Sequence, residues 1–193
     1  MDYPAQLDVQ TPDKVANWRP LVHWLMAIPH FIISYVLTIV AEVVAVISWF
    51  AILFTGKLPE GLANVTCMAL RYQMRTQAFA GFLHEEYPPF DFTTTPADPG
   101  GTPVTVNFVP ALGGRNRLTV ALRIIWLIPA AIVTFLILIV AVICHFIAFF
   151  AVLFTGKWPV GLLGWVMKGL RASLRLNAYA FLLTDEYPPL SFA

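Results

Sequence analysis

The feature that most constrains this fold is an internal repeat with a period of one hundred residues. The segment from Phe50 to Phe92 matches the segment from Phe150 to Phe192 at 21 of 43 positions, counted directly on the sequence. Similarity at a fixed spacing is the signature of a duplicated structural unit. We therefore expect two copies of one unit, residues 1–92 and 103–193, joined by a linker over residues 93–102.

The composition is typical of a membrane protein. Of the 193 residues, 59% are hydrophobic and 12% are charged, and the mean hydropathy is +0.73. Soluble domains carry about 25% charged residues. The net charge of +1 argues against a nucleic-acid partner, which would require a broad basic surface. The composition thus predicts the lipid bilayer as a partner.

Each copy contains a long apolar run. The first extends from Leu21 to Phe54. As a helix it would be ~50 Å long, which exceeds the ~30 Å hydrocarbon core of a bilayer. Pro29 and its counterpart Pro129 offer a natural break. We expect an interfacial segment before each proline and membrane-crossing helices over residues 30–54 and 130–154.

A tight turn follows each apolar run. Its glycine can cap the preceding helix, and its proline can open the next one. Return helices are expected over residues 59–83 and 159–183. Because these helices contain arginines, two alternatives are open: they cross the membrane, which their length favours, or they lie along the interface. The turn residues are Thr55, Gly56, Lys57 and Pro59, repeated as Thr155, Gly156, Lys157 and Pro159.

Short stretches of alternating apolar and polar residues flank the helices. They lie near residues 4–9, 90–93, 103–109 and 189–192, and such alternation is typical of strands. We expect these four pieces to meet in a small sheet beside the termini. The predicted fold is an all-α integral membrane protein with two tandem helical hairpins, four transmembrane helices in all, and short β-strands outside the membrane.

The hairpin arrangement predicts an orientation. The termini and the linker would share one side of the membrane, and both turns would lie on the other. Positive charge accumulates on the cytoplasmic side of membrane proteins. The turns carry only Lys57 and Lys157, so the termini and linker are expected in the cytoplasm. The cations on the side of the termini are Lys14, Arg19, Arg115, Arg117 and Arg123.

Glu42 is the one acid in an apolar helix. Its distance from the turn is close to that of Arg71 on the return helix. Charges inside a membrane usually pair or face water. We therefore predict an ion pair of Glu42 with Arg71 or Arg75, acting as a structural tie between the helices or, alternatively, as a proton or ion relay. The second copy has Val142 at this position, which favours the structural role.

Both copies keep a pair of arginines in the return helix. Arg71 and Arg75 correspond to Arg171 and Arg175, and each pair is spaced i, i+4, so its members share one helix face. Two roles remain open. The arginines bind lipid phosphates of the cytoplasmic leaflet, or they close salt bridges with Glu86, with its counterpart in the second copy, or with acids of the linker.

The sequence contains no recognisable catalytic constellation. The four histidines are each unmatched in the other copy, and none has the spacing of a metal-binding pair. Cys67 and Cys144 fall in apolar stretches and are expected to be small buried residues. The Gly-Lys of the turns lacks the upstream glycine and following hydroxyl residue of a phosphate loop. We expect no enzyme activity, no metal and no cofactor.

Three motifs carry a resemblance to a known family. They resemble those of the bacterial membrane proteins that form domain-of-unknown-function family 4389, and the resemblance covers nearly the whole chain. It implies a multi-pass protein of the bacterial inner membrane, without an established activity or known catalytic residues. The motifs are Ala27–His30, Trp49–Leu62 and Glu86–Phe90, of which the second copy repeats Phe150–Leu162 and Glu186–Leu190 but departs at Leu127–Ala130.

These observations favour a non-enzymatic function. The leading hypothesis is an accessory or scaffold subunit that packs against other membrane protein subunits in a larger complex. The alternative is a small transporter or channel built from two parallel repeats around an axis along the membrane normal. That alternative would depend on the charged residues Glu42 and Arg71.

Overall fold

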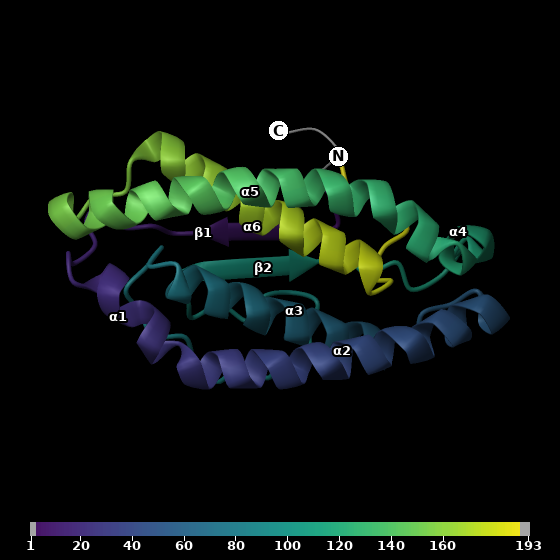
Figure 1. Cartoon of the computed structure of the whole chain (residues 1–193). Coiled ribbons are helices and arrows are strands. Elements are labelled where there is room, and N and C mark those ends of the chain that lie inside the picture. Colours follow the sequence, from purple (N-terminus) through teal and green to yellow (C-terminus); the bar gives the residue numbers. More distant parts are fainter. Residues whose placement is uncertain (1–2, 190–193) are drawn as a thin grey trace.

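The part of the chain that the structure describes folds into eight helices and strands. The structure is a computed structural model, and it describes residues 3–189. Each repeat contributes a strand, a short helix, a long helix and a return helix, in that order (Figure 1). The elements are β1 (Ala5–Val9), α1 (Arg19–Met26), α2 (Ile28–Thr55), α3 (Glu60–Ala80), β2 (Val104–Phe108), α4 (Arg117–Ala121), α5 (Arg123–Thr155) and α6 (Val160–Ala180).

The long helices α2 and α5 begin differently in the two repeats. In the first repeat the chain breaks at Ala27, and Pro29 lies in the first turn of α2, as expected. In the second repeat the break falls at Leu122, and Pro129 lies inside α5. The prediction of a break at Pro129 is therefore wrong. The side chain of Asn116 caps the short helix α4 just before this break, which moves the interruption upstream.

The return helices are shorter than predicted and do not resemble membrane spans. Both end at residue 80 or 180 because Phe82 and Leu182 adopt left-handed backbone angles, with φ of 47° and 64°. The Leu83 N–H then donates to the Ala78 carbonyl at 3.1 Å. Within residues 3–189 only α2 and α5 are long and apolar enough to cross a membrane. The expectation of four transmembrane helices is not supported.

The sheet contains two of the four expected strands. β1 and β2 pair antiparallel, with Leu7 opposite Val106 at the centre. Leu7 and Val106 occupy the same place in the two repeats, each three residues after a proline, so a pseudo-two-fold axis passes through this pair. Residues 90–93 form no strand, and of the piece near 189–192 residues 190–192 lie outside the described residues.

The repeats exchange their strands. β1 belongs to the first repeat but packs against α6 of the second, and β2 packs against α3 of the first. Two equivalent hydrogen bonds fix this exchange: Arg71 donates to the carbonyl of Val106, and Arg171 donates to the carbonyl of Leu7. The two copies therefore form one body rather than two separate hairpins.

Each turn lies beside the beginning of the other repeat. The Arg115 N–H donates to the Gly56 carbonyl, and the Val15 N–H donates to the Gly156 carbonyl. As a result α2 and α5 run in opposite directions along the molecule (Figure 1). The predicted topology, with both turns at one end and termini and linker at the other, is therefore wrong.

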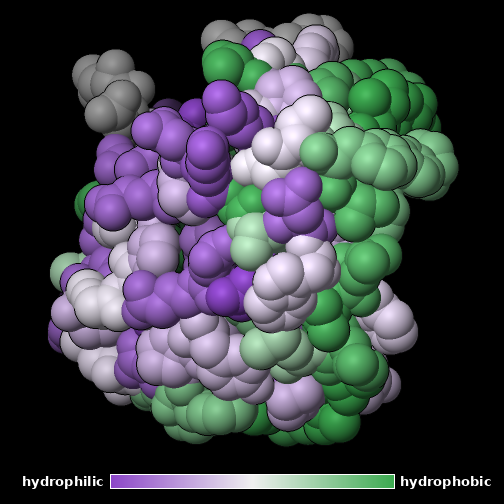
Figure 2. Space-filling model, turned by 90° about the vertical axis from the view of Figure 1, so that its left-hand side faces the viewer, coloured by the Kyte–Doolittle hydropathy of each residue, from purple (hydrophilic) through white to green (hydrophobic). Residues whose placement is uncertain are grey.

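The outer surfaces of α2 and α5 together form what we call the apolar face. Figure 2 looks along the molecule and shows hydrophobic residues gathered mainly on one side, with hydrophilic residues opposite. The exposed side chains of the apolar face are Ile28, Phe31, Ile32, Tyr35, Val36, Ile39, Val40, Val43, Val46, Ile47, Phe50 and Phe54 on α2, and Ile124, Ile125, Trp126, Ile128, Ile132, Phe135, Leu136, Ile139, Val140, Val142, Ile143, Phe146, Ile147, Phe150 and Phe154 on α5.

Candidate functional site

The paired arginines of the two return helices lie in different surroundings. Arg71 and Arg75 on α3 are only 2% and 3% exposed. The equivalent Arg171 on α6 keeps 42% of its side chain exposed. We call the first group, with its acidic partners Asp91 and Asp98, the closed cluster. The second group is the open cluster, and it consists of Arg171, Arg175, Lys168 and Asp8.

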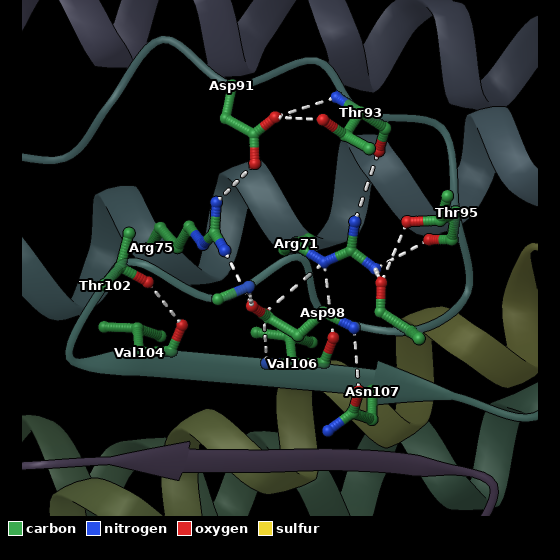
Figure 3. A network of polar contacts seen from close by, with 12 residues as sticks. Arg71, Arg75, Asp91, Thr93, Thr95, Asp98, Thr102, Val104, Val106 and Asn107 are labelled. Atoms are coloured by element: carbon green, nitrogen blue, oxygen red, sulfur yellow. Dashed lines mark hydrogen bonds and ion pairs between the residues drawn. The ribbon is translucent and has the colours of Figure 1, made fainter.

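Arg71 organises the linker in the closed cluster. Its Nε–H donates to the carbonyl of Val106 at 3.3 Å. Its Nη2 donates to the carbonyls of Thr95 at 2.7 Å and Ala97 at 3.0 Å (Figure 3). The carboxylate of Asp98 lies 3.6 Å from the Nε atom. One guanidinium thus folds an extended stretch of linker onto helix α3 and strand β2.

Asp98 completes the closed cluster. Its carboxylate accepts hydrogen bonds from Arg75 Nη2 at 2.9 Å, from the Val106 N–H at 2.7 Å and from the Gly100 N–H at 2.8 Å. The second terminal nitrogen of the Arg75 guanidinium, Nη1, donates to Asp91 at 2.8 Å. Because a buried carboxylate needs several donors to stay charged, this set stabilises Asp98 inside the protein.

Asp91 lies at the outer edge of the closed cluster. Burial alone would raise the pKa of its carboxyl group, but hydrogen bonds from Thr93 and Arg75 outweigh that effect and lower the pKa below its usual value. In the first repeat the arginines thus close salt bridges with the linker acid Asp98 and with Asp91 just before the linker, and salt bridges with linker acids were one of the two roles expected from the sequence. A lipid-phosphate role does not fit Arg71 and Arg75, because the linker covers them.

The predicted ion pair of Glu42 is not found among the described residues. Arg71 and Arg75 pair with Asp98 and Asp91 instead. Glu42 is exposed on α2, where its neighbours on the helix surface include the exposed Val43 and other residues of the apolar face. The sequence argument matched Glu42 and Arg71 by depth along two helices. It failed because Glu42 is exposed on α2, whereas Arg71 points to the linker.

The open cluster has fewer partners. Arg171 Nε donates to the Leu7 carbonyl at 3.0 Å, and its Nη2 lies 3.6 Å from the carboxylate of Asp8, which is 73% exposed. The guanidinium of Arg175 lies 5.7 Å from the ring centre of Tyr3. Within residues 3–189 the buried Nε of Arg175 has no hydrogen-bond partner. The Nε of its counterpart Arg75 also has no partner there, but the two Nη nitrogens of Arg75 bind two carboxylates.

A groove of about 590 Å³ lies beside the open cluster. It runs between α5, α6 and β1. Leu7 of β1 lines this groove. Three cationic side chains of α6 line it as well: Lys168, Arg171 and Arg175. The apolar part of the lining includes Ile137 and Met167. Cationic side chains that converge on a concave surface are suited to bind an anionic group.

A second acid that binds two arginines, the partly buried Asp185, was not predicted from the sequence. Asp185 binds the guanidinium groups of Arg115 and Arg123, and its carboxylate also accepts from the Asn116 N–H. Burial alone would raise the pKa of Asp185, but Arg115 and then Arg123 and Asn116 hold it below its usual value. The first repeat has Glu85 in this place, which binds the Ala16 N–H and Arg19. The presence of an acid in both copies was the available signal.

The two Thr-Gly-Lys turns have a structural role. The glycines adopt left-handed angles, with φ of 71° at Gly56 and 66° at Gly156, and cap the long helices as expected. Thr55 donates to the Ala51 carbonyl and accepts from the Lys57 N–H. The second turn repeats these bonds through Thr155 and Lys157, and Pro59 and Pro159 precede the return helices.

Titratable groups outside these clusters are dispersed. Among the described residues no three His, Cys, Asp or Glu side chains lie close enough to hold a metal ion. His84 is buried, and burial followed by the charge of His23 lowers its pKa to about 4, so it is neutral at pH 7. The arrangement of the described residues offers cation-lined anion binding at the open cluster and a large apolar surface on α2 and α5.

Comparison with known proteins yields one match. A family model described as a domain of unknown function, DUF4389, matches residues 17–91 and again residues 117–191. No curated protein and no solved structure matches the chain. The two matched segments are the two repeats, each without its strand.

Proposed function

The chain belongs to the family defined by the domain of unknown function DUF4389, which it contains twice, and we propose that it is a non-enzymatic accessory subunit at a lipid bilayer. In this proposal the apolar face is seated in the lipid, and the opposite, polar face carries a partner protein. The observation that carries the proposal is the direction of the hydrophobic gradient. It runs across the molecule from the apolar face to the hydrophilic side opposite (Figure 2), and exposed apolar side chains continue along the whole of α2 and α5.

The length of the apolar face supports helices that lie in the plane of the membrane. Exposed apolar side chains extend along α2 from Ile28 to Phe54 and along α5 from Ile124 to Phe154. At about 1.5 Å per residue these stretches are ~39 Å and ~45 Å long. A bilayer core of ~30 Å would leave a large part of such helices in water if they crossed it upright. A helix in the plane buries its whole apolar side.

The position of the charged residues supports the same arrangement. Asp8 and Arg171 form a largely exposed ion pair next to the central residue Leu7 of the sheet. The sheet lies near the middle of the molecule along the direction of α2 and α5 (Figure 1). If those helices crossed the bilayer, this ion pair would lie near the bilayer centre, where charges are costly. With the helices in the plane, the ion pair lies on the side facing water.

We propose that the polar face is turned to the cytoplasm, at the inner membrane of a bacterial cell. With the apolar face in the lipid, lysines and arginines gather on the polar side, and the positive-inside rule favours the cytoplasm for that side. In contrast to two upright hairpins, this seating places Lys57 and Lys157 of the turns on the same side as the linker. Exposed Trp18, Trp24 and Trp126 then lie at or near the apolar surface, where tryptophan is enriched at membrane interfaces.

The accessory role is supported by the division of the surface into two faces. One face suits lipid, and the other carries the open cluster with its groove. A soluble or membrane-bound partner of the polar face would thereby be held at the membrane. The transporter alternative has less support, because Glu42 and Arg71, on which it depended, lie in different environments.

The accessory role can be tested by native mass analysis. Membranes that contain the protein at its natural level would be extracted with a gentle detergent, and the mass of the extracted species measured. The proposal expects a defined complex heavier than one chain and a reproducible second protein. A lone chain under several gentle detergents would contradict it.

A further inference from the structure

We propose that the groove at the open cluster binds an extended peptide segment of a partner protein through a carboxylate of that segment. The first repeat supplies the template, because there the equivalent groove is filled by the linker of the chain itself. The proposal rests on the proposed function only in assigning the segment to a partner. The binding chemistry follows from the comparison of the two repeats.

The template is the site that binds the carboxylate of Asp98 in the closed cluster. Two groups of the surrounding protein hold its carboxylate: the guanidinium of Arg75, at 2.9 Å, and the backbone N–H of Val106, at 2.7 Å (Figure 3). The backbone carbonyls beside Asp98 accept from Arg71. An extended acidic segment thus fits against one helix and the outer edge of one strand.

The second repeat presents the same two donors. Arg175 occupies the place of Arg75, and Leu7 occupies the place of Val106. Because Gln10 donates across the sheet to Pro103, the alternation of an antiparallel ladder makes the Leu7–Val106 pair a non-hydrogen-bonded one. The N–H and C=O of Leu7 therefore point away from β2. Leu7 lines the groove, and its carbonyl already accepts from Arg171.

Differences between the repeats enlarge the groove of the second. Tyr72, which stacks on Phe92 of the chain with ring centres 5.5 Å apart, is replaced by Ala172. Asn64 is replaced by Gly164, around which a Cβ atom would meet nothing within 4 Å. Met68 is replaced by Lys168, which adds a positive charge. The second groove is therefore wider and more cationic than the one the linker fills.

The strand residue next to Leu7 favours a peptide over a lipid phosphate. In the first repeat Asn107 follows Val106, and its side-chain oxygen accepts the backbone N–H of Asp98 at 2.8 Å. In the second repeat this position is Asp8, which lies 3.6 Å from Arg171. A carboxylate there can accept the backbone N–H of a bound peptide, as Asn107 does in the first repeat, whereas a lipid phosphate group offers no such donor.

A peptide-binding assay on the full chain in detergent micelles tests the proposal. The probe is a fluorescent nonapeptide with the sequence of residues 90–98, Phe-Asp-Phe-Thr-Thr-Thr-Pro-Ala-Asp, and the control peptide has Asn at both Asp positions. We expect the control peptide to bind at least tenfold more weakly, because it lacks the charge that Arg175 would bind. Equal affinities of the two peptides, or no binding of the probe up to millimolar concentration, would overturn the proposal.

Variants of the protein test whether the probe peptide binds in the groove at the open cluster. Arg175→Gln should weaken binding of the probe at least tenfold, and Gly164→Phe, which fills the groove from an open position, should do the same even if Arg175→Gln folds poorly. The matched control Lys157→Gln removes an exposed cation at a turn and should leave the affinity unchanged. If a chain ending at Pro189 binds the probe and the full chain does not, the groove belongs to residues 190–193 and the proposal fails.

Binding to lipid vesicles tests whether the groove binds a lipid phosphate instead of a peptide carboxylate. Arg175-dependent binding to phosphatidylglycerol vesicles, without binding of the peptide, would assign the groove to lipid phosphate and overturn the proposal. Because the peptide assay needs no membrane, its outcome is independent of how the apolar face is seated. A heavier native complex without peptide binding would refute this inference alone, and peptide binding without a native complex would refute the accessory role alone.

Discussion

Leu7 and Val106 face each other at the centre of the two-stranded sheet, and each carries the backbone carbonyl that an arginine of the opposite repeat binds. The pair lies at the pseudo-two-fold axis, and each of these two arginine bonds links one repeat to the other. It also means that neither repeat contains all the partners of its own return helix. The repeats are units of sequence but not independent units of folding.

Separated repeats should therefore fail to fold alone. If the chain is divided after Pro99, residues 1–99 lack the strand β2 that packs on α3, and residues 100–193 lack β1. We expect each fragment expressed alone to be rapidly degraded by added protease in detergent, and the two co-expressed fragments to copurify and resist it. A single fragment that is a protease-resistant monomer would show that strand exchange is not required.

The buried acid Asp98 should contribute far more to stability than its exposed counterpart Asp8. Asp98→Asn leaves Arg71 and Arg75 with one fewer counter-charge in a site where the acid is 3% exposed. Breaking a buried ion pair costs about 3 kcal/mol or more, and an exposed pair contributes under about 1 kcal/mol. Urea unfolding in mild detergent would measure both. Asp8→Asn is the matched control, and equal losses would contradict the account.

Asp185 should make stability depend on acid pH. Its folded-state pKa is lowered below the usual value of 3.8, because Arg115 and Arg123 outweigh the effect of burial. A lowered pKa means that the folded state binds fewer protons than the unfolded state in this range. Its contribution is therefore present above about pH 4 and is lost as the pH falls through the folded pKa.

The measurement for Asp185 is unfolding at pH 6, 4.5 and 3. The wild-type chain should lose stability between the two lower values. Asp185→Asn should be less stable at pH 6 but should lose less on acidification. If the variant and the wild type show the same pH slope, Asp185 does not carry a lowered pKa.

A charge on the apolar face should weaken membrane binding without unfolding the protein. Phe135 is 62% exposed on α5, so Phe135→Lys removes little packing but would place an ammonium group in the lipid. We expect at least a tenfold lower partition into neutral phosphatidylcholine vesicles, measured by flotation. The matched control is Thr94→Lys on the exposed linker. Equal partition of the two variants would mean that the apolar face is not the membrane-binding surface.

The parts of the fold that depend on nearby residues were predictable from the sequence. The glycine caps at Gly56 and Gly156, the interruption near Pro29 and the approximate extents of the long helices follow from short-range stereochemistry. Pro129 was the exception, because the capping of α4 by Asn116 competes with it. The stretches near residues 4–9 and 103–109 were expected to share a sheet, but their antiparallel register was not predictable, since Leu7 and Val106 are 99 residues apart and nothing local selects between them.

The sequence identified the arginines of the two clusters but not the groups that they bind. The repeat singled out Arg71, Arg75, Arg171 and Arg175, and all four lie on the side of the return helices that faces a strand of the other repeat. Their partners were missed because Asp98 comes from a linker whose sequence has no regular pattern. Glu42 was chosen as a partner by its depth along the hairpin, and depth alone could not tell that Glu42 is exposed on α2 while Arg71 points to the linker.

The most direct test of the account is the accessibility of single cysteines at positions 57 and 97. Lys57 lies in the first turn and Ala97 in the linker, both are exposed, and the native Cys67 and Cys144 are buried. Cells and inside-out vesicles would be treated with a membrane-impermeant maleimide. Helices in the plane of the membrane predict that Lys57→Cys and Ala97→Cys are labelled from the same side, the cytoplasmic one. Labelling from opposite sides would show that α2 crosses the bilayer and would contradict the proposed seating.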